Sequence, residues 1–202
     1  MGYGLGSLPS AYLLVKWKSG LDIRNAGSGN VGTLNSLQVT GSRLLGVLVL
    51  VLDFIKGLVS VALASALFSG LFPPLAAAGI GAVIGHNFPI WLKFKGGRGL
   101  ATAAGVMSVM APVLIAVWGV VWGGGFLLFR KVNVANVLAT LLSLVAIIAV
   151  GDGTLIRVTV LDTAPISFRA FGIIVYSIIL LKHINPIREF VVERTKPSRE
   201  EP

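Results

Sequence analysis

The sequence contains no cysteine and only two histidines, His86 and His183. Without cysteine there is no disulfide framework, no thiol nucleophile and no thiolate ligand for a metal. Two histidines are too few for the usual histidine-based metal centre. We therefore expect a protein without a metal site.

Charged residues are also scarce. They make up 12% of the 202 residues, about half the fraction in a typical soluble domain. Hydrophobic residues make up 55% and gather in long uncharged runs, which a soluble core does not need. The sequence therefore predicts an all-α integral membrane protein, with a single transmembrane domain at residues 1–190 and a charged cytoplasmic tail at 191–202.

Acidic residues are scarcer than basic ones: 8 Asp and Glu stand against 17 Lys and Arg, and the net charge is +9. The basic residues lie in short clusters between apolar runs, not in a stripe interleaved with aromatic residues. Such clusters are typical of cytoplasmic loops and attract anionic lipid and phosphate groups. We expect membrane lipid as a partner and no nucleic acid.

Apolar runs cover residues 3–15, 44–72, 75–92, 100–129, 132–150 and 164–181. A crossing usually needs about 20 residues, so the first run predicts one short helix. Polar loops separate the runs, at 16–43, 93–99 and 151–163.

The run at 100–129 decides the number of crossings. Basic loops should share the cytoplasmic side, which requires the chain to cross an even number of times between Leu100 and Phe129. About 30 residues of straight helix reach about 45 Å, too little for two full crossings of a core about 30 Å thick. Pro112 can break this run into two short helices, for about seven crossings, whereas one long tilted helix gives six. We expect seven, with Gly-rich loops on the cytoplasmic side.

Residues 25–35, Asn-Ala-Gly-Ser-Gly-Asn-Val-Gly-Thr-Leu-Asn, form a polar Gly-rich segment. Its glycines allow close backbone approach, and Ser28, Asn30 and Asn35 supply short polar side chains. Backbone N–H groups in such turns can form an anion-binding nest. The Lys-Ser/Thr end of a Walker loop is missing. A flexible linker between two helices is the alternative.

Asp53 and Lys56 lie inside an apolar run. Three residues apart, they share one helix face and can pair. Charges within a membrane span are costly and usually mark a functional site. A buried ion pair that only fixes helix packing is the alternative, and Asp53 orienting Lys56 toward a bound anion would unite the two.

A basic Gly-rich loop runs directly into an apolar helix at 94–102, Phe-Lys-Gly-Gly-Arg-Gly-Leu-Ala-Thr. Backbone N–H groups at a helix N-terminus and an arginine guanidinium suit a phosphate. The candidate phosphate-binding residues are Lys95, Gly96, Gly97 and Arg98. An ordinary basic cytoplasmic loop is the alternative.

Both histidines stand near the ends of apolar runs. His86 lies in Gly-His-Asn-Phe-Pro at 85–89, where a lone histidine is more often a hydrogen-bonded core residue than a catalyst. His183 lies in Lys-His-Ile-Asn-Pro-Ile-Arg at 182–188, with Asn185 beside it. A histidine between cations at a helix end is either a membrane-interface anchor or a polar donor in a site.

Taken in order, these segments resemble the acyl-phosphate:glycerol-3-phosphate acyltransferases, small bacterial membrane enzymes that begin phospholipid synthesis. The first family motif is similar to Asp-Ile-Arg-Asn-Ala-Gly-Ser-Gly-Asn-Val-Gly at 22–32, followed by Asp-Phe-Ile-Lys-Gly at 53–57. The second is similar to Gly-His at 85–86 and then to 94–102, and the third begins like Lys-His at 182–183. The resemblance covers almost the whole chain.

The resemblance implies seven transmembrane helices in the bacterial cell (inner) membrane and an active site facing the cytoplasm. It implies transfer of an acyl chain from acyl phosphate to the 1-hydroxyl of glycerol 3-phosphate, which gives lysophosphatidate and phosphate. It implies no metal and no cofactor. Because phosphate is already a good leaving group, orientation and charge neutralisation would supply most of the rate.

On this hypothesis Gly96, Gly97 and Arg98, with Lys95 beside them, bind one substrate phosphate. A catalytic group binds the other phosphate or the developing oxyanion, and it comprises Ser28, Asn30, Asn35 and Lys56. His183 donates a hydrogen bond to substrate, a substrate phosphate takes the proton, and the acyl chain lies in an apolar groove between helices. The supporting residues are Asp53, His86 and Asn185.

The chain departs from the family pattern at several positions. Leu34 stands where the family has Thr, Gln38 where it has Arg, and Pro186 where it has Asn. Losing an arginine or an amide donor is not conservative, so one alternative is a catalytically impaired paralogue that binds lipid or phosphate. Charges within spans suggest a small anion transporter as a second alternative, although the sequence has no inverted repeat.

Overall fold

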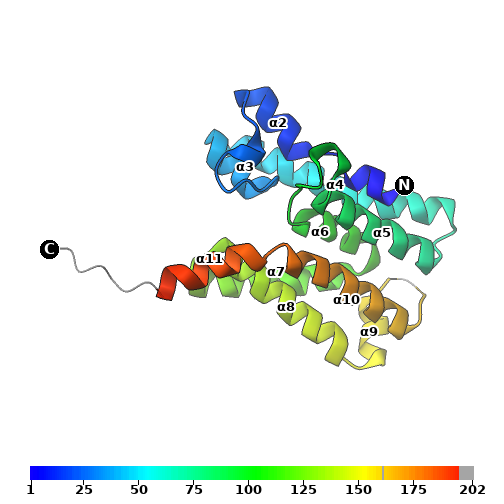
Figure 1. The fold of residues 1–202 in the computed structure, drawn as a ribbon. Helices are drawn as coiled ribbons and strands as arrows, with labels where there is room; N and C mark the ends of the chain where they lie inside the picture. Colours follow the sequence, from blue (N-terminus) through cyan, green and yellow to red (C-terminus); the bar gives the residue numbers. More distant parts are fainter. Residues whose placement is uncertain (161, 196–202) are drawn as a thin grey trace.

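The computed structural model describes residues 1–160 and 162–195, and every regular element in this part of the chain is a helix. The elements are α1 (Gly2–Gly6), α2 (Ser10–Ser19), η1 (Ile23–Asn25), α3 (Thr33–Thr40), α4 (Arg43–Leu67), α5 (Phe72–Asn87), η2 (Ile90–Leu92), α6 (Leu100–Met110), α7 (Pro112–Phe129), α8 (Val132–Ala149), α9 (Asp152–Val158), α10 (Pro165–Leu181) and α11 (Ile184–Thr195). The longer helices form a bundle, and α2 and α3 lie together on one side of it (Figure 1). The predicted all-α fold is confirmed.

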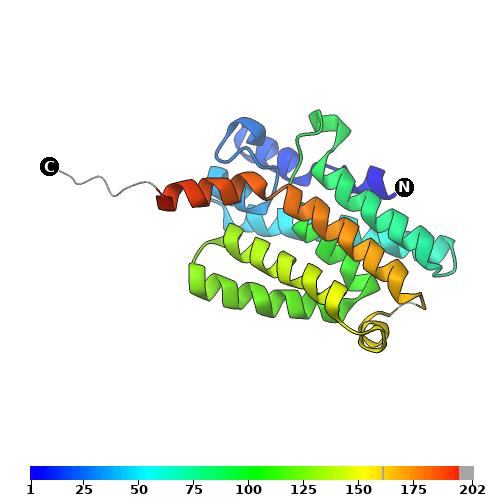
Figure 2. The ribbon, with the colours of Figure 1, turned by 60° about the horizontal axis from the view of Figure 1, so that its bottom comes forward.

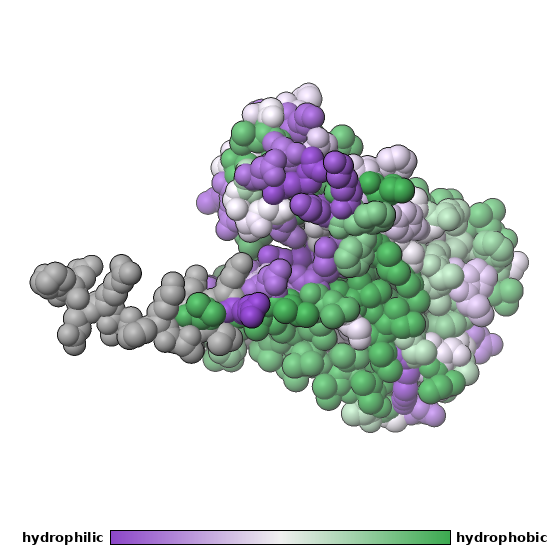
Figure 3. All heavy atoms as spheres, in the orientation of Figure 1, coloured by the Kyte–Doolittle hydropathy of each residue, from purple (hydrophilic) through white to green (hydrophobic). Residues whose placement is uncertain are grey.

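The surface of the bundle suits a lipid environment. Within residues 1–160 and 162–195, four helices are long and apolar enough to cross a membrane: α4, α5 with η2, α7 and α8. Many large apolar side chains on α4 and α7 are exposed, among them Leu44, Val120 and Leu128. Apolar surface covers much of the bundle in Figure 3, whereas hydrophilic residues gather over α2 and α3. An exposed apolar surface of this extent fits lipid, and the chain is a multi-pass membrane protein.

The apolar run at 100–129 is broken at Pro112, as the seven-crossing arrangement requires. Pro112 lacks the N–H that continues an α-helix, and its ring disfavours helical geometry at the residue before it. Ala111 accordingly leaves the helical region, with φ −158° and ψ 73°, and α7 begins at the proline. The shorter apolar helices are α6 and α10. The count of seven crossings stays a prediction.

The prediction of one helix over residues 3–15 is wrong, because α1 ends at Gly6 and α2 begins at Ser10. Pro9 interrupts the helix by the same chemistry as Pro112. Tertiary packing also places α1: Gly6 lies so close to the backbone of Ala82 on α5 that a Cβ has no room there. The chain therefore turns at Ser7 and Leu8, which brings both residues to the site.

Three segments predicted as loop or tail contain helices. The polar stretch at 16–43 holds the end of α2, η1 and α3, and the loop at 151–163 holds α9. The start of the predicted tail is helical, because α11 runs to Thr195. Residues 196–202 of that tail lie outside the described residues, and the boundary at 190 stays a prediction.

Two apolar clusters hold the molecule together. The larger lies between α4, α5, α6, α8 and α10, and near one end the rings of Phe72, Phe168 and Phe171 meet with centroids 5.9–6.3 Å apart. The smaller joins α2 and the loop after it to α4, through residues such as Val15, Ile23 and Val49. Figure 2 shows α7 and α8 side by side, and α11 continuing beyond the end of α10. Through Val31, the smaller cluster packs the polar segment 25–35 against α4.

Candidate active site

Asn35 organises the first Gly-rich segment. Its side chain is only 1% exposed, and its Oδ1 accepts a hydrogen bond from the backbone N–H of Ser28 at 2.9 Å. Its Nδ2 donates to the carbonyls of Ile23, Ala26 and Asn30 at 3.3, 3.0 and 3.0 Å. The segment is therefore an ordered loop held from inside, and the linker alternative is wrong.

The loop folds around this amide because two of its glycines take left-handed backbone angles. Gly27 has φ +58° and Gly29 has φ +69°, which other residues adopt only with strain. A Cβ on Gly27 would also collide with Oδ1 of Asn35. Ser28, between them, is exposed, whereas Asn30 is half-buried. The turn thus presents Ser28 outward, as the catalytic hypothesis requires.

Arg24, at the start of this loop, is bound to a neighbour. Its guanidinium donates to both carboxylate oxygens of Asp22, at 2.9 and 2.6 Å, and lies 5.2 Å from the ring centroid of Tyr12. The hydrogen bond from Arg24 lowers the pKa of Asp22 to about 2. The pair braces the loop against α2.

The predicted pair of Asp53 and Lys56 is present and buried. Lys56 Nζ lies 2.8 Å from Asp53 Oδ1 and donates to the carbonyl of Leu8 at 2.9 Å. His86 Nδ1 lies 3.6 Å from the same carboxylate oxygen. The three side chains are between 2% and 7% exposed. Lys56 thereby ties α4 to the α1–α2 turn, so its ammonium group is directed at protein groups.

A small polar cavity adjoins this trio and connects the two Gly-rich loops. It encloses about 190 Å³, and its walls include Lys56, His86, Gly96 and Val31. The carbonyl of Val31 lies against the Cα of Gly97. The structure thus brings the first loop, the charged trio and the second loop together, as the sequence predicted.

The second loop is packed tightly onto the end of α5. Gly97 donates its N–H to the carbonyl of His86 at 3.1 Å, and a Cβ there would collide with the His86 ring. Gly99 takes φ +86° directly before α6, with its Cα against the Asn87 amide. Lys95, in contrast, is exposed. The glycine spacing follows from this packing, and α6 begins two residues after Arg98.

Arg98 and the end of α10 form a positively charged cluster. Arg98 Nη1 donates to Asn133 Oδ1 on α8 at 2.5 Å. Lys182 Nζ lies 4.4 Å from the ring centroid of Phe88. Burial and the positive charge of Arg98 lower the pKa of Lys182. An anion in this cluster would relieve the repulsion between the two cations.

His183 is fully buried beside Arg98. Its Nδ1 lies 2.8 Å from the carbonyl of Ile179, which can only accept, so Nδ1 carries the proton. Burial lowers the pKa of His183 to about 4, and Arg98 adds to the shift, so the ring is neutral at pH 7. Nε2 is then an acceptor, and no partner for it is present among the described residues. In this tautomer the ring offers a lone pair at Nε2, and the predicted role of hydrogen-bond donor to substrate stays a prediction.

Asn185 and Pro186, the other two residues noted in the third segment, lie at the start of α11. Asn185 is exposed at the start of α11, and Pro186, which is buried, lies in the first turn of that helix. A proline is tolerated there because the first N–H groups of a helix have no partner within it.

Sequence reasoning missed Asn87 and Asn133 and gave Lys182 no role of its own. The side chain of Asn87 is fully buried, and neither its nitrogen nor its oxygen has a hydrogen-bond partner within the described residues. Asn133 stands in an apolar run near Asn136, and polar residues within a span are a signal that a site is near. Lys182 was named only as the first residue of the third motif.

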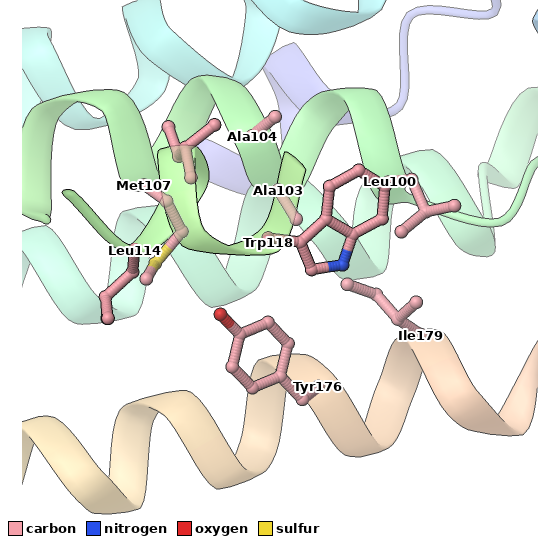
Figure 4. A pocket seen from close by; sticks show the side chains of 9 residues that line it. Leu100, Ala103, Ala104, Met107, Leu114, Trp118, Tyr176 and Ile179 are labelled. Atoms are coloured by element: carbon pink, nitrogen blue, oxygen red, sulfur yellow. The ribbon is translucent and has the colours of Figure 1, made fainter. Parts of the chain in front are cut away.

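An apolar cavity of about 390 Å³ begins where α6 begins (Figure 4). Its walls come from α6, α7 and α10, and the side chains of Trp118 and Tyr176 face each other across it. The lining residues are Leu100, Ala103, Ala104, Met107, Leu114, Ile115, Trp118, Tyr176 and Ile179. Leu100 is two residues beyond Arg98, so the cavity starts next to the cationic cluster.

Known proteins resemble the chain over most of its length. The family model described as Glycerol-3-phosphate acyltransferase matches residues 1–192. A glycerol-3-phosphate acyltransferase of Myxococcus xanthus is 46% identical over 112 residues, which cover 55% of this chain and 58% of that protein. The matched stretch spans about half the length of three such relatives, between 47% and 58%.

Two solved structures share the fold. One is PlsY, an integral membrane glycerol 3-phosphate acyltransferase, in its glycerol 3-phosphate form. It matches with a TM-score of 0.81 and 33% identity, over 96% of this chain and 90% of that one. The lysophosphatidic acid form of PlsY matches with a TM-score of 0.78 and 32% identity, over 96% and 89% of the two chains.

Proposed function

The chain belongs to the glycerol-3-phosphate acyltransferase family, and on this premise we propose that it transfers an acyl chain from acyl phosphate to the 1-hydroxyl of glycerol 3-phosphate. The products are lysophosphatidate and phosphate. One observation supports this most directly: a cationic cluster of Arg98 and Lys182 lies beside an apolar cavity that starts at Leu100. A phosphate and an acyl chain need such a pair of environments side by side.

Glycerol 3-phosphate places its phosphate at Arg98. The guanidinium and Lys182 supply positive charge, and the start of α6, two residues beyond Arg98, supplies backbone N–H donors. Binding an anion here reduces the repulsion between the two cations, which favours an anionic group such as a phosphate. The solved glycerol 3-phosphate form of PlsY shows that a relative of this fold binds this substrate.

Acyl phosphate lies with its chain in the apolar cavity and its phosphate at the loop of Ser28. The cavity of about 390 Å³ extends along α6 from Leu100 to Met107, so a long chain leaves water as it enters. The exposed Ser28 hydroxyl and neighbouring N–H groups of the loop serve the phosphate and the developing oxyanion.

The reaction is a direct acyl transfer. The 1-hydroxyl oxygen attacks the carbonyl carbon of acyl phosphate, and a new C–O bond forms. The bond from that carbon to the phosphate oxygen breaks, and phosphate leaves with the electron pair. His183 Nε2 accepts a hydrogen bond from the attacking hydroxyl and orients it, while the departing phosphate takes the proton. A nitrogen with a pKa of about 4 orients the hydroxyl well but is a weak base, so phosphate is the better proton acceptor.

Four buried side chains hold the site in shape and do not contact substrate: Asn35, Lys56, Asp53 and His86. Asn35 shapes the Ser28 loop from inside, because both of its N–H donors already meet loop carbonyls. The trio of Asp53, Lys56 and His86 anchors the α1–α2 turn and the second loop. The departures from the family pattern leave these contacts intact: Gln38 is exposed, and Pro186 lies where a helix tolerates it.

Orientation in the membrane completes the proposal. The loops that carry Ser28 and Arg98 face the cytoplasm of a bacterial cell, in the inner membrane, because the basic loops gather with them.

The test is turnover by the purified full chain in detergent, with a long-chain acyl phosphate and glycerol 3-phosphate. We expect stoichiometric release of phosphate and lysophosphatidate, and no product when an acyl thioester replaces acyl phosphate. Ser28→Ala and Arg98→Ala should abolish turnover, whereas the matched exposed-site controls Ser167→Ala and Arg157→Ala should not. A folded protein that binds substrate without turnover would be an impaired paralogue, and anion flux in vesicles without turnover would identify a transporter.

A further inference from the structure

The N-terminal half of α8 carries a row of polar side chains on one face, and each has a defined partner. Asn133 Oδ1 accepts from Arg98 Nη1 at 2.5 Å. One turn further on, Asn136 Oδ1 accepts from Trp122 Nε1 at 2.7 Å, and then Thr140 Oγ1 accepts from Trp118 Nε1 at 3.2 Å. The last two bonds join α8 to its neighbour α7. The first reaches across to the loop that binds phosphate in the proposed function.

The backbone of Asn133 is fixed by the packing of α8. Asn133 is the second residue of α8, whose neighbour is α7. Gly125 on α7 lies directly against Ala135, so the two helices pack closely at this level. The amide of Asn133 therefore extends from a backbone that is held in place by packing.

Arg98, in contrast, sits at the end of a Gly-rich loop on a long side chain. Ordering such a side chain at the moment of binding costs conformational entropy, which weakens binding. The hydrogen bond from Nη1 to Asn133 restricts the orientation of the guanidinium before substrate arrives. A planar guanidinium recognises phosphate through paired donors, so its orientation decides whether they meet the phosphate oxygens.

The acceptor is neutral, so this hydrogen bond does not itself cancel the charge of Arg98. A carboxylate at position 133 would hold Arg98 as well but would cancel the charge that attracts phosphate. We infer that Asn133 is a positioning residue for acyl transfer, whose amide orients the Arg98 guanidinium toward the phosphate of glycerol 3-phosphate without neutralising it. This inference rests on the proposed function.

The test compares Asn133→Ala and Asn133→Asp with Asn136→Ala, a matched control one turn away whose partner is a tryptophan. We expect Asn133→Ala to raise KM for glycerol 3-phosphate about tenfold, in line with the loss of one hydrogen bond to a charged group. KM for acyl phosphate should change less than about twofold, as should both constants in Asn136→Ala. Asn133→Asp should raise KM for glycerol 3-phosphate more than Asn133→Ala does, although it keeps the hydrogen bond.

Calorimetric titration with glycerol 3-phosphate gives a second readout, in the wild type, Arg98→Ala, and Arg98→Ala with Asn133→Ala. If Asn133 acts through Arg98, adding its substitution to Arg98→Ala weakens binding less than about twofold further. An equal loss with and without Arg98, or an Asn133→Asp protein that binds as well as wild type, would overturn the inference.

The two proposals fail separately. A wild-type protein that binds glycerol 3-phosphate but does not turn over refutes the proposed reaction, and the dissociation constants then decide the role of Asn133 alone. A folded wild-type protein that does not bind glycerol 3-phosphate removes the phosphate site at Arg98, and the role of Asn133 with it. Thermal unfolding of each variant in detergent separates loss of binding from loss of fold.

Discussion

The amide of Asn35 offers the sharpest test of how the Ser28 loop is built. Replacing Asn35 with Ala removes the acceptor for the Ser28 N–H and the donors to Ile23, Ala26 and Asn30. The bond to Ile23 is long at 3.3 Å, so the estimate counts the three shorter bonds. At a net value of about 0.5–1.5 kcal/mol each, the loop loses about 1.5–4.5 kcal/mol of local stability.

Limited trypsin digestion measures this local stability, because Arg24 lies within the loop and becomes cleavable when the loop opens. Cleavage of a transiently open segment follows its equilibrium population. At about 1.4 kcal/mol for each tenfold change, cleavage after Arg24 should accelerate roughly 10- to 1,600-fold in Asn35→Ala. Cleavage after Lys93, exposed in the other loop, should keep its wild-type rate and serves as an internal control.

The isosteric change Asn35→Asp sharpens the test. A carboxylate keeps the acceptor for the Ser28 N–H but faces three loop carbonyls with no donor, so this variant should open more than Asn35→Ala. Turnover should fall in both variants because the loop no longer presents Ser28. Variants with an unchanged digestion rate but reduced turnover would refute the reasoning, and would place Asn35 in contact with substrate instead.

Three further predictions concern other parts of the molecule. Burial lowers the pKa of His183 from 6.5 to about 4, so between these pH values the unfolded chain binds a proton that the folded chain does not. The free energy of unfolding should therefore fall as the pH drops through this window, and it should fall less steeply in His183→Asn. Thermal unfolding that depends on pH equally in both proteins would contradict this. Ala104→Phe should fill part of the apolar cavity and lower kcat/KM for a long-chain acyl phosphate at least about tenfold, while kcat/KM for a short-chain acyl phosphate stays unchanged. The control Ala116→Phe, on the exposed face of α7, should leave both values unchanged. Equal losses for both chain lengths would exclude the cavity as the acyl site. Since the chain has no cysteine, Lys131→Cys and Thr154→Cys can be labelled from outside the cell with an impermeant maleimide: seven crossings predict labelling at 154 alone, and six predict labelling at 131 alone.

Local chemistry made several features predictable from the sequence. Long uncharged runs are enough to predict membrane helices, because lipid offers no partner for backbone polar groups. Pro112 predicted the break between α6 and α7, because a proline lacks the backbone N–H that continues a helix in any surroundings. Asp53 and Lys56 pair as their spacing predicts, because three residues bring two side chains onto one helix face.

The sequence also located the site through its motifs, but it could not assign the direction of each side chain. Ser28 and Asn35 have similar polarity in the sequence, yet one is exposed and the other is buried with its donors used within the loop. Lys56 had the charge to bind phosphate, and the fold directs it to Asp53 and Leu8 instead. Such assignments depend on which other segments lie within hydrogen-bonding distance.

The sequence by itself determined that this is an all-helical membrane protein with phosphate-suited loops, because hydropathy, proline breaks and glycine turns act over a few residues. Only the tertiary structure decided that residues 3–15 split into two helices, that His183 presents a lone pair and that Arg98 rests on Asn133. These features arise where helices distant in the sequence meet. The partner of a buried polar group is set by the packing of the whole bundle, which no local pattern encodes.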